Sequence, residues 1–140
     1  MSTTDRFREQ HNQLLMSTKE MSSHLKADQL ATNAETVCQS LAKLAGLLSV
    51  HLSMEDKVLY PKLLNHPDTG MRATTNKFIN EMGTVKEVFT DYVKKWQNPT
   101  SIQKNPAGFI NDTQGIFNTL SKRIERENNE LYAMVDRLVQ

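Results

Sequence analysis

The fold of this chain is decided by one stretch, His51-Leu-Ser-Met-Glu55-Asp-Lys-Val-Leu-Tyr60-Pro61. His51 and Glu55 stand four residues apart, so they share one face if the stretch is helical. That face continues a stripe with alternating spacings of four and three, which is typical of the buried side of a helix in a bundle. An imidazole and a carboxylate therefore occupy positions where apolar side chains are expected. The stripe consists of Val37, Leu41, Leu44, Leu48, His51, Glu55 and Val58.

The rest of the chain repeats the helical spacing, and no segment has the period-two alternation of a strand. Long amphipathic helices joined by short loops predict an all-α protein, an antiparallel up-down-up-down four-helix bundle. The length of 140 residues fits a single domain, 1–140. We expect helices over about Thr4–Lys26, from Thr32 or Asn33 to near Pro61, Met71–Trp96 and Ala107–Leu138, with a loop from Asn98 to Pro106.

Composition excludes several classes of function. The 17 basic and 16 acidic residues leave a formal net charge of +1 without a basic stripe, so no nucleic-acid partner is expected. No apolar run approaches the ~18 residues of a membrane span, and the N-terminus lacks the apolar region of a signal peptide. We therefore expect a cytoplasmic protein without membrane contact. Cys38 is the only cysteine, which excludes an internal disulfide and a thiolate metal cluster.

Polar residues interrupt the stripes of three predicted helices. Unpaired burial of such groups costs roughly 2–7 kcal/mol each, so partners are required. If consecutive helices are antiparallel, residues at equal distances from their connecting loop lie at the same level. On this basis the polar residues form one layer of the bundle, facing two apolar residues of the third helix. Two imidazoles and two carboxylates can ligate iron or another divalent metal there. The layer holds His11, His51, Glu55, Arg123 and Glu127, opposite Phe78 and Met82.

A second interpretation needs no metal. The same residues can form a closed hydrogen-bond network that fixes the register of the helices. Arg123 can point into this network, or its long side chain can reach the surface and pair with Glu81. Phe78 and Met82 are ordinary core residues in either case.

The residues resemble those of the hemerythrin-like, HHE cation-binding family over nearly the whole chain. Three motifs carry the resemblance. They are Glu9-Gln-His11-Asn-Gln-Leu14, His51-x-x-x-Glu55 with Leu59-Tyr60-Pro61, and Arg123-Ile-x-x-Glu127 with Leu131-Tyr132. Such proteins are four-helix bundles that hold two irons, bridged by two carboxylates and otherwise bound by histidines.

The resemblance implies that His11, His51, Glu55 and Glu127 are metal ligands, the two glutamates standing at the bridging positions. This chain departs from the family pattern at the other iron. Phe78 and Met82 stand where the third helix usually offers two histidines, and Arg123 replaces the histidine of the fourth helix. One metal position is thus expected to be lost, with the Arg123 guanidinium supplying positive charge near it.

Three functions follow as expectations. The first is a degenerate, mononuclear site for iron or another divalent metal, used in metal, redox, dioxygen or nitric oxide sensing or binding rather than in oxygen transport. The second is a metal-free interaction or structural module in which Arg123 replaces the second metal. The third, ranked last, is a small one-iron oxidase or peroxidase, because no substrate pocket or catalytic constellation is visible. The sequence names no protein partner.

Overall fold

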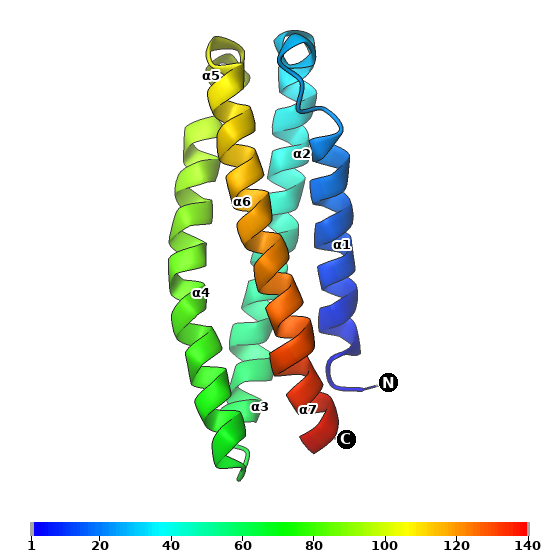
Figure 1. Cartoon of the computed structure of the whole chain (residues 1–140), viewed down its shortest axis with the longest axis vertical. Coiled ribbons are helices and arrows are strands. Elements are labelled where there is room, and N and C mark those ends of the chain that lie inside the picture. Colours follow the sequence, from blue (N-terminus) through cyan, green and yellow to red (C-terminus); the bar gives the residue numbers. More distant parts are fainter. Residues whose placement is uncertain (1, 140) are drawn as a thin grey trace.

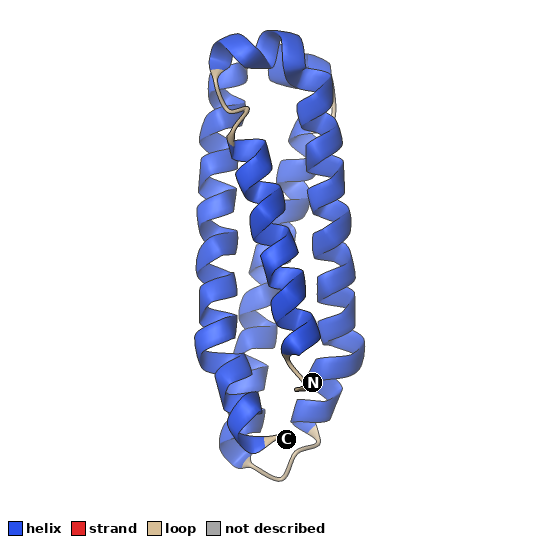
Figure 2. Cartoon of the chain, turned by 90° about the vertical axis from the view of Figure 1, so that its right-hand side faces the viewer, coloured by secondary structure: helices blue, strands red, loops and turns tan. Residues whose placement is uncertain are grey.

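The computed structural model describes residues 2–139, and none of these lies in a strand. The prediction of an all-α protein is confirmed. Long helical segments lie side by side along the molecule's long axis, and α5 lies at the end opposite both termini (Figures 1 and 2). The elements are α1 (Asp5–Ser22), α2 (Ala27–Met54), η1 (Glu55–Leu59), α3 (Tyr60–Leu64), α4 (Thr69–Trp96), α5 (Pro99–Lys104), α6 (Pro106–Arg126), η2 (Glu127–Leu131) and α7 (Tyr132–Leu138).

The predicted loop between Asn98 and Pro106 was wrong, because it contains the short helix α5. Each Asn-Pro pair begins a helix as well as ending the preceding one. The side chain of Asn98 accepts a hydrogen bond from the Thr100 amide at 2.9 Å, and that of Asn105 accepts one from Gly108 at 3.0 Å. Asparagine at the N-cap followed by proline at the first helical position is a strong start signal.

The first predicted turn was placed too late. The first helix ends at Ser22 rather than near Lys26, and α2 begins at Ala27 rather than near Thr32. Lys26 has extended backbone angles, φ −126° and ψ 132°, and the chain becomes helical again directly after it.

Two π-helical segments, η1 and η2, interrupt the long helices at Glu55 and Glu127. The Tyr60 amide donates to the carbonyl of Glu55, and the Tyr132 amide donates to the carbonyl of Glu127, which are both i to i+5 bonds. Such π-turns insert one extra residue and are frequent at functional sites. The first π-turn ends at Leu59, two residues before Pro61.

The extra residue in η1 moves the buried stripe by one position. Val58, predicted to be buried, is 56% exposed. The next residue, Leu59, is 1% exposed and takes its place in the core. After η2 the buried residues are Leu131, Tyr132, Met134 and Val135, whereas Leu138 is 42% exposed. The strict four-three spacing fails here because it assumes 3.6 residues per turn throughout.

One continuous helical segment, Ala27–Leu64, is long and apolar enough by length and composition to cross a membrane, contrary to our expectation from apolar runs. A single such segment is weak support for a membrane span, since a core helix of a soluble protein passes the same test. Here the apolar residues Val37, Leu41 and Leu44 are at most 1% exposed because they form the core.

The core consists of two apolar clusters separated by a polar layer. One cluster includes Leu14, Leu48 and Ile124, and the other includes Phe7, Leu59 and Leu131. On the three long segments that carry the polar residues, these lie between members of the two clusters, so the polar layer is enclosed on both sides. This enclosure separates the site from bulk solvent.

The π-turn in the second long segment generates a stability prediction. Leu59→Ala should lower the free energy of unfolding by about 2–5 kcal/mol, because it empties a buried position. Val58→Ala should change it by less than about 0.5 kcal/mol, because its side chain is exposed. Urea denaturation of both variants measures the difference. An uninterrupted α-helix would give the opposite order.

Candidate metal centre

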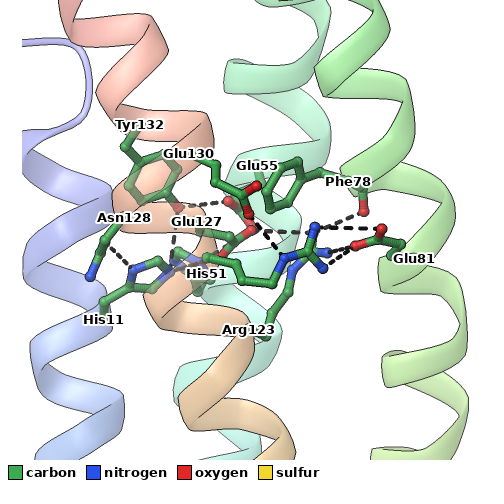
Figure 3. A network of polar contacts seen from close by, with 11 residues as sticks. His11, His51, Glu55, Phe78, Glu81, Arg123, Glu127, Asn128, Glu130 and Tyr132 are labelled. Atoms are coloured by element: carbon green, nitrogen blue, oxygen red, sulfur yellow. Dashed lines mark hydrogen bonds and ion pairs between the residues drawn. The ribbon is translucent and has the colours of Figure 1, made fainter.

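The polar layer brings together the predicted site residues from three long segments (Figure 3). Each of them is at most 6% exposed, so the layer is a buried site. The first helix supplies one imidazole, the end of α2 supplies the other, and the two glutamates open the π-turns. The residues are His11, His51, Glu55, Arg123 and Glu127.

Three potential ligand atoms meet at the centre of this layer. The Nε2 atoms of His11 and His51 are 3.0 Å apart, and His11 Nε2 is 2.9 Å from Glu127 Oε1. His51 Nε2 is 3.8 Å from the same oxygen. One ligand atom from each of the three residues lies within 4.8 Å of the others, which is the separation expected around a shared cation.

The outer nitrogens of the two imidazoles determine which protonation state the inner ones have. His11 Nδ1 is 2.8 Å from Asn128 Oδ1, and His51 Nδ1 is 2.7 Å from Gln10 Oε1. Amide oxygens only accept, so each Nδ1 donates and a neutral ring directs its Nε2 lone pair into the centre. Two nitrogen lone pairs 3.0 Å apart repel each other unless one nitrogen is protonated or a metal cation binds both. The donor set therefore fits a metal, and Asn128 and Gln10 orient its histidines.

Glu55 lies beside this centre rather than within the closest group. Its Oε1 is 3.3 Å from His51 Nε2, and its Oε2 accepts a 2.7 Å hydrogen bond from the Tyr132 hydroxyl. The Tyr132 ring also stacks on the His11 ring, with centroids 5.1 Å apart. Tyr132 thus fixes one carboxylate and one imidazole together, while Glu55 Oε1 keeps no hydrogen-bond partner among the described residues.

Arg123 reaches inward and toward the third long helix at once. Its Nη2 donates to the carbonyl of Phe78 at 2.8 Å and lies 3.4 Å from Glu127 Oε2. Its Nη1 lies 3.6 Å from Glu81 Oε2, so both sequence-based alternatives for this side chain describe part of the arrangement. The guanidinium also sits 4.7 Å above the Phe78 ring. Phe78 is therefore a core residue that also anchors the arginine.

Met82 and the apolar residues around it border the candidate centre. They enclose a cavity of about 20 Å³ next to His11, His51 and Glu127. That volume is about enough for one water-sized molecule. Met82 is 5% exposed and belongs to the apolar core, as predicted for a position without a ligand.

Burial and charge separate the pKa values of the layer. Burial opposes protonation of His51, but contacts with Glu127 and Glu55 outweigh it and raise its pKa to about 9. Burial raises the pKa of Glu55, and the charge of Glu127 adds to this effect. Burial acts on Glu127 too, but the contacts with His11 at 2.9 Å and His51 at 3.8 Å and the Arg123 charge hold the pKa of Glu127 well below its usual value. Without a metal, His51 is cationic at neutral pH.

Sequence reasoning missed the supporting residues Gln10, Asn128 and Tyr132. Gln10 and Asn128 each directly adjoin a predicted ligand, His11 or Glu127. Adjacent residues on a regular helix point in different directions, so spacing alone did not place them in the site. Tyr132 enters the layer through the π-turn, which spacing also did not predict. Cys38 lies elsewhere, half-buried against the Trp96 carbonyl.

An all-helical chain with a buried histidine–carboxylate cluster defines a class of metal-binding helical proteins. The family model of the hemerythrin HHE cation-binding domain matches residues 2–135. The chain therefore belongs to the hemerythrin HHE cation-binding family, and the resemblance noted from its motifs is confirmed. No curated protein and no solved structure matches the chain.

The pKa of His51 predicts how the metal-free protein responds to pH. The folded-state value of about 9 exceeds the ordinary value of 6.5, so the folded state binds more protons between them. This contribution to stability is present below pH 6.5 and is lost as the pH rises through 9. Urea midpoints of chelator-treated protein should therefore fall between pH 7 and 9.5. His51→Gln should reduce this fall, and an identical fall in both proteins would contradict the account.

Proposed function

We propose that this chain binds a single divalent cation, with iron as the physiological metal, through His11, His51, Glu55 and Glu127. The carrying observation is the pair of imidazole Nε2 atoms 3.0 Å apart, both beside the Glu127 carboxylate. The hydrogen bonds that fix both Nδ1 atoms support ligation through Nε2. We further propose that the long helical segments form the antiparallel up-down-up-down four-helix bundle typical of such sites.

The proposal of one metal instead of two rests on the residues of the opposite side. Phe78 and Met82 are buried apolar residues and offer no ligand nitrogen or oxygen from their side chains. The Arg123 guanidinium lies on the outer oxygen of Glu127, where a second cation would otherwise share that carboxylate. A fixed positive charge there replaces the electrostatic contribution of the lost metal.

We propose sensing or binding of a small ligand as the use of this site. A bound iron would supply an open coordination position for a diatomic molecule such as dioxygen or nitric oxide. The cavity of about 20 Å³ beside His11, His51 and Glu127 offers room for a molecule of that size. The cavity is lined by apolar residues such as Leu14 and Met82 as well as by the candidate ligands. A cytoplasmic location remains part of this proposal.

A metal-free interaction or structural module is the second candidate function. The observation that favours it is the raised pKa of His51, about 9. When His51 is protonated, the positive charges of His51 and Arg123 balance the negative charges of the two glutamates. No metal is then needed to neutralise the layer. The two candidates differ in one respect that is directly measurable, the metal content of the folded protein.

Metal content tests the proposed function. Protein loaded with Fe²⁺ under anaerobic conditions and then desalted should retain about one iron per chain by mass spectrometry, and chelation should lower its melting temperature. His51→Ala should abolish bound iron because it removes one of the converging ligand nitrogens. Glu55→Ala should weaken iron binding because it removes a proposed carboxylate ligand.

The matched control is His24→Ala, because His24 lies in the turn after α1 and outside the layer. It should retain wild-type iron. Two irons per chain would contradict the mononuclear site. Absence of iron, zinc and manganese from the wild-type protein after loading would favour the metal-free module.

A further inference from the structure

The two oxygens of Glu127 face different positive partners. Oε1 lies 2.9 Å from His11 Nε2, at the candidate metal position, whereas Oε2 lies 3.4 Å from Arg123 Nη2. Oε2 is buried and has no hydrogen-bond partner among the described residues, so the guanidinium is its nearest counter-charge there. One carboxylate thus connects the metal position directly to a permanent cation.

The guanidinium is held where it is by the third long helix. It donates to the Phe78 carbonyl at 2.8 Å, stacks above the Phe78 ring at 4.7 Å and faces Glu81 at 3.6 Å. Its exposed fraction is 6%. An arginine side chain stays protonated in proteins, so this charge is present at every relevant pH. Neither rotation nor deprotonation removes it readily from the site.

The net charge of the other groups in the layer determines how favourably a cation of a given charge binds at the metal position. Glu55 and Glu127 contribute −2 and Arg123 contributes +1, so the layer with neutral imidazoles carries −1. A divalent ion brings the sum to +1, and a trivalent ion brings it to +2. Glu81 offsets little of this charge, because it is 35% exposed and shared with Arg126. Charge repulsion in a buried layer is stronger than in water.

We propose that Arg123 makes the site selective for divalent over trivalent cations, and thereby holds a redox-active metal in its lower oxidation state. The inference rests on the proposed metal binding and adds the property that distinguishes this site. The guanidinium acts through Glu127 and through its own charge, and it does not touch the metal. Arg123 is accordingly a positioning and selectivity residue.

Competition between two redox-inert ions tests this inference. The ratio of affinities for Zn²⁺ and Ga³⁺ is measured in the wild-type protein and in Arg123→Met, which keeps a long apolar side chain but no charge. The variant should shift the ratio toward Ga³⁺ by at least about tenfold. A tenfold change corresponds to about 59 mV in a one-electron potential, so the midpoint potential of the iron-loaded variant should fall by about that amount or more.

Two control variants separate charge from packing. Arg123→Lys keeps the charge and should keep most of the wild-type selectivity. Arg126→Met removes a neighbouring charge that lies on the same Phe78 ring, at 4.9 Å, but is 38% exposed. This variant should change the ratio less than about twofold.

The outcomes separate this inference from the proposed function. If the wild-type protein binds neither ion, the metal site itself is wrong. If it binds Zn²⁺ and Arg123→Met leaves the ratio unchanged, Arg123 does not set selectivity and the inference is overturned. If Arg123→Met does not fold, Arg123→Gln supplies the test, because its amide is uncharged but can still donate a hydrogen bond to the Phe78 carbonyl. It should shift the ratio toward Ga³⁺ in the same direction, and an unchanged ratio would then overturn the inference.

Discussion

The structure depends on keeping two carboxylates and two imidazoles inside a helical core. Buried charges are tolerated only when they are paired, hydrogen-bonded or bound to a metal. Here the outer nitrogens of both imidazoles are satisfied by amide oxygens, while the inner nitrogens of His11 and His51 converge with Glu127. Positive charge is therefore needed where these atoms converge. A divalent cation or a proton supplies it there, and Arg123 supplies it on the other side of Glu127.

Local backbone geometry makes this arrangement achievable. Both carboxylates open π-turns, and each π-turn ends before a tyrosine that enters the core. The shift of one residue brings Tyr132 against Glu55 and the ring of His11, which a regular helix would not do. It also turns Leu59 inward to close the core beyond the site. The π-turns therefore position residues of the polar layer and also residues of the apolar core beside it.

The sequence predicted the helical class and the gathering of the polar residues, because alternating spacing identifies the buried face of a regular helix. It failed where helices are irregular. Neither π-turn was predicted, because the alternating spacing assumes 3.6 residues per turn throughout the helix. Gln10 and Asn128 were missed because polar residues beside a ligand are common on solvent-facing positions. Their roles follow from the neighbouring helices, which spacing within one helix does not describe.

The central claim is that one carboxylate, Glu127, joins a single metal to a guanidinium that stands in place of a second metal. An anomalous-difference map at the iron absorption edge, from crystals grown with Fe²⁺ under anaerobic conditions, tests this most directly. The account predicts one peak within bonding distance of the Nε2 atoms of His11 and His51 and of Glu127, with Arg123 still on the far oxygen. Two peaks, or a single peak on the side that Arg123 occupies, would contradict it.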